Sequence, residues 1–215
     1  LVKSYSGGHA RTIKSLAVSE DNGRIISGGE DRSLFLWEVS TGRIIRRISA
    51  HQQAVNCVIF NADATLFFAA SDDRTISAWA LRSDSRQPVQ LFRDFKDAVT
   101  SVALSPAGSA LCAGSVDCHL RTFDIRNGQM WKDNLCDPVT CVNVSSDGRA
   151  VLSSCMGSSS SSSSSSNSNN SSSSSSSGSS SSSSSRESDG NSTGGGNSGA
   201  AYLTDFASGV LLQEF

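Results

Sequence analysis

The sequence predicts an all-β protein, a β-propeller of about four blades, and three observations lead to this fold class. Similar residues recur about every 42 positions, as at Asp31 and Asp73. Within each period, short runs rich in Ile, Val and Leu are separated by turns that contain Asp, Asn and Gly. No long segment shows the 3.6-residue spacing of an amphipathic helix. Short strands repeated at a fixed period are typical of propeller blades.

The repeat keeps its spacing along the chain. The interval is 42 residues from Asp31 to Asp73, 44 from Asp73 to Asp117, and 40 from Val99 to Val139. Each unit contains segments such as TIKSLAV, GRIISGG and SLFLWEV, which we expect to form its successive strands. The predicted blades cover residues 1–48, 49–92, 93–133, and 134–157 together with 199–215.

A serine-rich tract interrupts the last unit. Gly128 and the matching Gly209 are 81 residues apart, and subtraction of a 40-residue period leaves an excess of 41. Residues 158–198 number 41 and contain almost only Ser, Asn and Gly, with a few charged residues. Such a segment has no apolar side chains to offset the entropy of ordering it. We therefore expect a disordered insertion within one blade, and not a linker between two domains.

Composition excludes several classes of protein. The 18 basic and 20 acidic residues give a net charge of −2, so direct contact with nucleic acid is not expected. No apolar run approaches the roughly 20 residues that span a bilayer. The six cysteines form no CxxC pair, and Cys57 and Cys141 occupy a position that Ser15 and Ser101 fill in the other units. We expect buried free thiols in a reducing compartment, no metal site and no cofactor.

The repeated residues resemble those of WD repeats. The markers are His9 and His51, then SGGED, AASDD or AGSVD, then LFLWEV, ISAWAL or LRTFDI. The resemblance covers the chain outside the insertion. It implies a ring of seven blades, of which about four would be present here. It also implies a non-catalytic scaffold that binds protein partners on a rigid disc and acts on no small-molecule substrate.

Some segments carry a narrower resemblance within this family. They are RQPVQ, CAGSVDCHLRTFDIRNGQM, DPVTCVNVSSDGRAVLSS and LTDFASGVLL. They are similar to a scaffold of mitogen-activated protein kinase signalling that is also associated with spliceosomes. This implies kinase-cascade or spliceosomal partners and a cytoplasmic and nuclear location. Another WD adaptor, such as a ubiquitin-ligase substrate receptor, is the alternative.

The WD resemblance also implies a hydrogen-bonded set in each blade. Its members are a His before the first strand, a Ser or Thr in the second, an Asp in the next turn and a Trp in the third. The second unit fills all four positions, the first has Gly29 at the Ser position, and the third lacks the His and the Trp. Loss of the Asp should therefore destabilise the second unit more than the third. The predicted set comprises His9, Asp31, Trp37, His51, Ser71, Asp73, Trp79 and Asp117.

A Ser, a His and an Asp together also raise the possibility of a hydrolase triad. Ser71 lies between AA and DD, however, and no Gly-x-Ser-x-Gly turn exposes it. A triad also requires an accessible nucleophile and an oxyanion hole. The sequence therefore predicts a structural network and no enzyme.

One face of the disc is the candidate surface for partners. In WD repeats, the turns that carry the Asp and the loops before each first strand lie on the same face. Charged side chains at these places are the natural contacts, and Arg is enriched at protein interfaces. The candidate residues are Arg11, Glu30, Arg32, Asp72, Arg74, Lys96 and His119.

Overall fold

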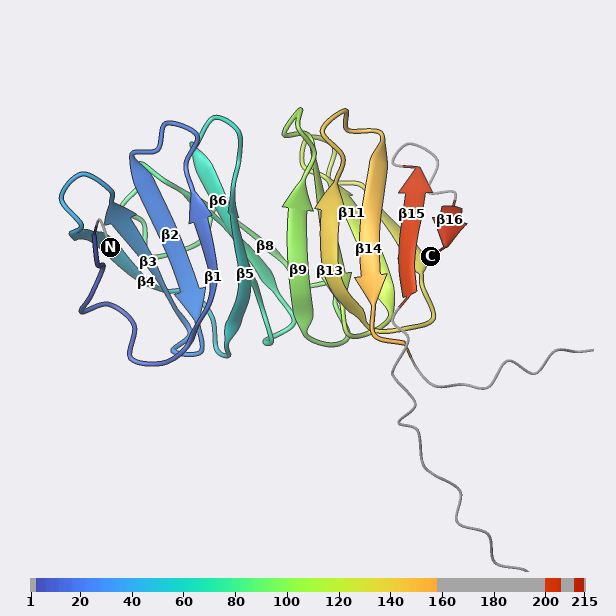
Figure 1. The fold of residues 1–215 in the computed structure, drawn as a ribbon, viewed down its shortest axis with the longest axis horizontal. Helices are drawn as coiled ribbons and strands as arrows, with labels where there is room; N and C mark the ends of the chain where they lie inside the picture. The colour runs from blue at the N-terminus through green and yellow to red at the C-terminus, as the bar shows by residue number, and fades with distance from the viewer. Residues whose placement is uncertain (1–2, 158–199, 206–210, 215) are drawn as a thin grey trace, which may run out of the picture.

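The computed structural model describes residues 3–157, 200–205 and 211–214, and it confirms the all-β fold class. In these residues sixteen strands form four antiparallel sheets of four strands each (Figure 1). The described part of the chain has no helix that could span a membrane. The predicted insertion at residues 158–198 lies outside the described residues.

Each sheet corresponds to one repeat. The first contains β1 (Ile13–Val18), β2 (Arg24–Gly29), β3 (Ser33–Glu38) and β4 (Ile44–Ser49). The second contains β5 (Val55–Phe60), β6 (Leu66–Ser71), β7 (Ile76–Ala80) and β8 (Gln90–Phe92). The third contains β9 (Val99–Leu104), β10 (Ala110–Ser115), β11 (His119–Asp124) and β12 (Met130–Asn134). The fourth contains β13 (Val139–Val144), β14 (Ala150–Cys155), β15 (Ala200–Asp205) and β16 (Leu211–Glu214).

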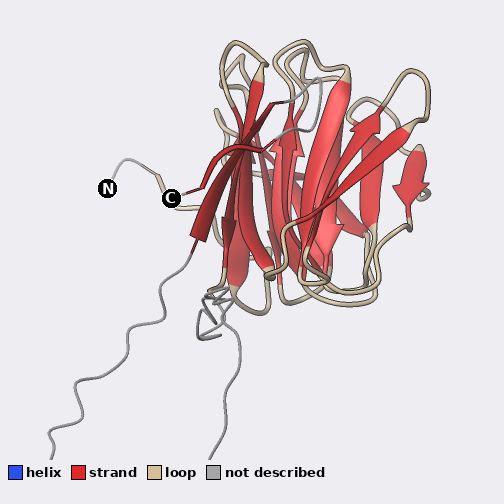
Figure 2. Ribbon diagram, turned by 90° about the vertical axis from the view of Figure 1, so that its right-hand side faces the viewer, coloured by secondary structure: helices blue, strands red, loops and turns tan. Residues whose placement is uncertain are grey.

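Strands are neighbours in each sheet in the order in which they follow along the chain. Loops and turns therefore gather at the two ends of the strands, as Figure 2 shows. In the first three blades, the turn between the second and third strands places the residue after the Asp at positive φ. The angles are 64° at Arg32, 67° at Arg74 and 65° at Cys118. We call the end of the disc that carries these turns the turn face.

The sheets stack face to face, with apolar side chains between them. Gly28 of the first blade shows how closely they approach, because a Cβ there would lie 2.6 Å from Val55 Cγ1 of the second. A Cβ at Gly114 of the third blade would likewise lie 2.5 Å from Val139 Cγ1 of the fourth. Larger residues at these two glycines would push neighbouring blades apart. The small residues of the repeat thus set the spacing between the blades.

Hydrogen bonds also join the first strands of successive blades. Register shifts next to Lys14, Asn56 and Thr100 turn these side chains toward the next blade. Lys14 Nζ donates to Asn56 Oδ1 at 2.9 Å, and Asn56 Nδ2 donates to Val99 O at 2.9 Å. Thr100 Oγ1 donates to Val139 O at 2.7 Å. This row holds the four blades in register along their inner edges.

The cysteines are all free, but they are not all buried. The expectation of buried thiols is wrong for Cys136 and Cys141, which are exposed. Cys57 is partly covered because its Sγ lies 3.8 Å from Val102 O of the third blade. Cys141 occupies the same position in the fourth blade, and no further blade follows among the described residues. Exposure at this position depends on the neighbouring blade and not on the residue type.

Candidate functional site

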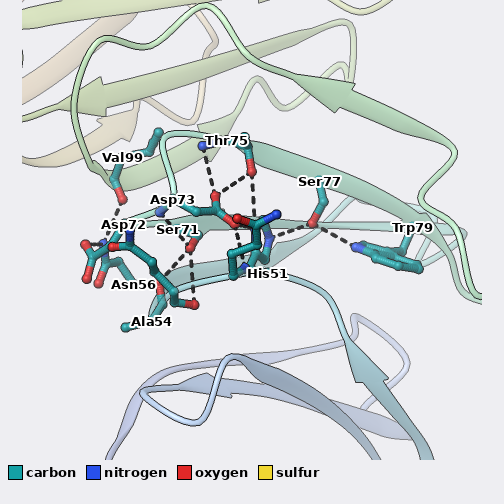
Figure 3. A network of polar contacts seen from close by, with 12 residues as sticks. His51, Ala54, Asn56, Ser71, Asp72, Asp73, Thr75, Ser77, Trp79 and Val99 are labelled. Carbon is teal, nitrogen blue, oxygen red and sulfur yellow. Dashed lines mark hydrogen bonds and ion pairs between the residues drawn. The ribbon is translucent and has the colours of Figure 1, made fainter.

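A continuous chain of hydrogen bonds, which we call the relay, crosses the second blade. Trp79 Nε1 donates to Ser77 Oγ at 2.8 Å, and Ser77 Oγ lies 2.7 Å from His51 Nε2 (Figure 3). His51 Nδ1 lies 2.9 Å from Asp73 Oδ2. The indole can only donate and the carboxylate can only accept, so Trp79 Nε1–H donates to the hydroxyl and Nδ1–H of His51 donates to Asp73. The relay therefore joins the third strand, the loop before β5 and the Asp turn without leaving any of these groups unpaired.

Ser71 does not belong to this relay, which corrects the sequence-based assignment. Its Oγ donates to Ala54 O at 2.8 Å and accepts from the Asp73 backbone N–H at 3.1 Å. Ser71 therefore fixes the start of the turn, while the relaying hydroxyl belongs to Ser77 of β7. The sequence analysis did not identify Ser77.

The first blade contains the same relay, with its hydroxyl on a different strand. Ser27 Oγ of β2 lies 2.7 Å from His9 Nε2 and accepts from Trp37 Nε1 at 2.8 Å. His9 Nδ1 lies 2.9 Å from both oxygens of Asp31. The relay of the first blade is therefore complete although Gly29 stands where the sequence-based interpretation expected its Ser.

Ser27 and Ser77 lie on different strands of their blades, but at the two members of the same cross-strand pair. Ser27 pairs with Phe35 of β3, and Ala69 pairs with Ser77 at the corresponding register in the second blade. Either strand can therefore supply the hydroxyl at one point in the blade. This compensation is the signal in the sequence that could have identified Ser77.

The third blade replaces the relay with an ion pair. Arg121 donates from Nη1 to Asp117 Oδ1 at 2.9 Å and from Nη2 to Oδ2 at 2.7 Å. The guanidinium lies 4.8 Å from the ring centre of Phe95, which stands where the first two blades have His. Arg121 is only 1% exposed. Asp117 therefore has a strong buried partner, although its His and Trp partners are missing.

The fourth blade lacks the network among the residues that the structure describes. Leu135 and Thr204 stand at the His and Trp positions. The buried Ser153 Oγ has no hydrogen-bond partner in the described part of the chain. Among the described residues, a side-chain hydrogen bond from His or Arg to the turn Asp is thus found in the first three blades.

Two of the turn carboxylates have strongly lowered pKa values. Burial alone would raise the pKa of Asp73, but hydrogen bonds from His51, Thr75 and the Gln52 N–H outweigh burial and hold the pKa far below its ordinary value. Burial opposes ionisation of Asp117 in the same way. Hydrogen bonds from Arg121 and the Lys96 N–H, with the charge of Arg121, lower the pKa of Asp117 to about 2. Both carboxylates are ionised anchors at neutral pH.

The network offers no accessible nucleophile. Ser71 and Ser77 are both fully buried at 0% exposure. A hydrolase serine must reach its substrate. Among the described residues, no group of three or more His, Cys, Asp or Glu side chains is arranged to hold a metal ion. The arrangement can stabilise the blades.

One candidate binding surface is a hollow of about 350 Å³ on the turn face, between the first and second blades. It brings together four of the seven candidate residues, whereas Arg74, Lys96 and His119 lie outside it. Three lining residues are absent from the predicted set: Lys14 lies in the first strand and not in a loop, and Gln52 and Gln53 carry no charge. The hollow is lined by Arg11, Lys14, Glu30, Arg32, Gln52, Gln53, Ala54 and Asp72.

Two of the cations in this hollow are unpaired. Lys14 Nζ lies 3.7 Å from Asp72 Oδ2 and also donates to Asn56 Oδ1. The exposed side chains of Arg11 and Arg32 make no ion pair or hydrogen bond with any described residue. These two guanidinium groups are therefore available to a partner.

His119 is less available than the other candidate residues. Its side chain is 19% exposed, and Nδ1 lies 2.5 Å from the Asp117 backbone oxygen and 3.4 Å from Oδ1. Its ring therefore supports the turn of the third blade more than it faces solvent. Lys96 and Arg74 remain exposed on the turn face.

Comparison with known proteins places this geometry in context. Residues 8–169 match the family described as the N-terminal β-propeller domain of nucleolar protein 10-like proteins. The WD repeat domain-containing protein 83 homolog of Dictyostelium discoideum is 29% identical over 176 residues, which cover 68% of this chain and 53% of that protein.

Two further relatives carry names from pre-mRNA processing. Pre-mRNA-processing factor 19 of Mus musculus is 30% identical over 133 residues, which cover 60% of this chain and 26% of the relative. The U5 small nuclear ribonucleoprotein 40 kDa protein of Dictyostelium discoideum is 36% identical over 121 residues, which cover 56% of this chain and 33% of the relative. The matches thus span about half or less of the length of these relatives.

Proposed function

Because the chain belongs to the WD-repeat family through its nucleolar protein 10-like propeller domain, we propose that it is a non-catalytic scaffold whose turn face binds an acidic segment of a protein partner. Its relatives with WD repeats support a role in protein interaction. Rigid strands that carry loops at two ends are suited to such binding.

The observation that carries this proposal is the pair of free arginines beside the hollow. Arg11 and Arg32 are exposed and have no acidic partner among the described residues. A guanidinium can bind a carboxylate or phosphate through two parallel hydrogen bonds. Gln52 and Gln53 add amide donors and acceptors at the same place. An acidic peptide would satisfy the two cations and use the amides for orientation.

The proposed partners are components of pre-mRNA splicing complexes, and the proposed location is therefore the nucleus. Two relatives with splicing-related names support this proposal. The chain also resembles, at the level of single residues, the mitogen-activated protein kinase organizer, a WD-repeat scaffold also associated with spliceosomes. On this resemblance we add kinase-cascade components to the proposed partners and the cytoplasm to the proposed locations. The net charge of −2 favours protein over nucleic acid as the directly bound partner.

The test is affinity capture from nuclear extract with the 215-residue chain, followed by mass spectrometry. The variant Arg11→Glu with Arg32→Glu reverses both free charges in the hollow. Arg74→Glu is the matched control, because Arg74 occupies the same turn position and a similar positive φ in the second blade but lies outside the hollow. We expect splicing proteins to be captured by the parent and the control and lost by the double variant.

Other outcomes would change the proposal. Capture of kinase components alone would replace the splicing role with the kinase role, and capture of ubiquitin-ligase subunits would favour a substrate receptor. Equal capture by the parent and the double variant would remove the turn-face hollow from the mechanism.

A further inference from the structure

A second hollow, of about 500 Å³, lies on the outer rim of the disc, away from the turn-face hollow. It is bounded by β4 of the first blade and by the loop that joins β7 to β8 in the second. Its lining residues are Arg46, Arg47, Ile48, Ser49, Asp84 and Arg86. We call this hollow the rim groove.

The rim groove follows the edge of a strand. Four consecutive residues, 46–49, line it, although successive side chains in a strand point to opposite faces of the sheet. A hollow that touches all four therefore runs along the backbone edge of β4. Among the strands that the structure describes, β4 is the outermost of its sheet and pairs only with β3. It presents a six-residue edge, whereas β8 at the same place in the second blade has three residues.

One wall of the rim groove is held in place by Arg46. Its guanidinium donates to the backbone oxygens of Ser83 and Ser85 in the loop. The same group lies 6.0 Å from the ring centre of Trp79. The loop is thereby tied to the edge strand, so the groove exists before a ligand binds. A preformed site loses less entropy when it is occupied.

The groove carries excess positive charge. Its lining contains three arginines and one aspartate, Asp84. Arg47 lies over the ring of Phe35 at 5.5 Å, and neither Arg47 nor Arg86 forms an ion pair with a described residue. Since Arg46 is engaged with the loop, Arg47 and Arg86 are the cations that can meet an incoming anion.

We propose that the rim groove binds an acidic peptide in extended conformation, which adds to the free edge of β4 as a fifth strand. The backbone of β4 would supply hydrogen bonds, and Arg47 and Arg86 would bind carboxylates of the peptide. A peptide is favoured over single-stranded RNA because no aromatic side chain lines the groove, and RNA grooves use aromatic rings for stacking. This site is independent of the turn-face hollow.

The test measures binding of a fluorescent peptide that alternates glutamate and valine to the 215-residue chain by anisotropy. The comparison peptide has the same sequence with alternate backbone amides N-methylated, which keeps the charge and removes strand pairing. We expect the first peptide to bind and the methylated one to bind at least about tenfold more weakly. Arg86→Glu and Arg47→Glu should each weaken binding about tenfold, at low salt most clearly.

The control variant is Lys132→Glu, which reverses an exposed cation on β12 at the rim of the third blade. It should leave binding unchanged. Arg86 lies in an exposed loop, so its variant should keep the circular dichroism of the parent. Equal binding of both peptides, or no effect of either Arg variant, would overturn the proposal. Tighter binding of oligouridine than of the peptide would overturn it in favour of a nucleic-acid groove.

Discussion

The second and third blades anchor the same turn carboxylate in different ways. Asp73 accepts side-chain hydrogen bonds from His51, which is connected to a hydroxyl and an indole, and from Thr75. Asp117 accepts two side-chain hydrogen bonds, both from Arg121. The second blade distributes the anchor over several side chains, and the third concentrates it in one buried guanidinium. Two blades with the same fold should therefore respond differently to loss of the carboxylate.

The two blades share one backbone hydrogen bond of the anchor. Asp73 accepts from the Gln52 N–H at 2.9 Å, and Asp117 accepts from the Lys96 N–H at 2.9 Å. In each case the donor follows the His position of the repeat. In the second blade the N–H and the hydroxyl of Thr75 also donate to Asp73 Oδ1, at 3.1 and 2.6 Å. The turn thus accepts two different interior partners, His51 in the second blade and Arg121 in the third.

The largest expected effect follows from removal of Asp117. Asp117→Ala leaves the guanidinium of Arg121 buried without a counter-charge, which costs about 3–5 kcal/mol of unfolding free energy. Asp73→Ala leaves the His51 and Thr75 donors without their acceptor, which costs about 1–3 kcal/mol. Urea unfolding of both variants measures the two losses. Asp117→Ala should thus be more destabilising than Asp73→Ala, whereas the sequence alone predicts the opposite.

A double variant provides the control for this comparison. Asp117→Ala combined with Arg121→Met removes both charges and should recover a large part of the lost stability, because no ion remains buried. If Asp73→Ala proves more destabilising than Asp117→Ala, the ion pair is not the stronger anchor and the comparison fails.

The sequence predicted the fold because the repeat is carried by residues that recur. Asp31, Asp73 and Asp117 mark the turns, and alternating apolar runs mark the strands. Ser77 and Arg121 could not be found in this way. Ser77 and Arg121 lie at the same position of the repeat, in the second and third blades. This position holds Phe35 in the first blade and Tyr202 in the fourth, so no residue type repeats there. Their roles follow from pairing across strands, which spacing along the chain does not show.

The binding surfaces were only partly predictable for a related reason. Charge and turn position identified Arg11 and Arg32, which line the turn-face hollow. Arg74 has the same sequence context but lies outside that hollow. The rim groove depends on Arg46 reaching the loop of the next blade, a contact between residues 37 and 39 positions apart. Such contacts depend on how the blades pack and not on the pattern within a repeat.

A smaller effect is expected on acidification, and it should be complete at a higher pH in the third blade than in the second. Both carboxylates have lowered pKa values, so the stability they contribute is present above the ordinary Asp pKa and is lost as pH falls through the folded pKa. For Asp117 the window lies between 3.8 and about 2, which corresponds to about 2 kcal/mol. The pKa of Asp73 is held lower, so more of its contribution survives at pH 2.

Urea unfolding from pH 5 to below pH 2 tests this difference. Asp117→Asn and Asp73→Asn should each lose less stability than the parent between pH 5 and pH 2, because each lacks a titrating group. Below pH 2 only the Asp73→Asn profile should continue to separate from the parent, because the pKa of Asp73 is held lower. Parallel pH profiles for the parent and Asp117→Asn would show that the ion pair does not lower the pKa of Asp117.

The smallest expected effect concerns the hydroxyl of the relay. It tests whether this hydroxyl must come from one particular strand or only has to lie at one point in the blade. Ser77→Ala removes the hydroxyl between Trp79 Nε1 and His51 Nε2 and should cost about 1–2 kcal/mol in urea unfolding. Adding Ala69→Ser restores a hydroxyl from the paired residue of β6, as Ser27 supplies it in the first blade. We expect the double variant to regain most of the loss.

The matched control for this rescue is Ala70→Ser with Ser77→Ala. Ala70 is equally buried on the same strand, but its side chain belongs to the core shared with the third blade. A hydroxyl there faces apolar neighbours and cannot reach His51, so stability should fall further. Equal stability of the two double variants would mean that any added hydroxyl is tolerated. Rescue by Ala69→Ser alone would show that the blade requires a hydroxyl at one place and accepts it from either strand.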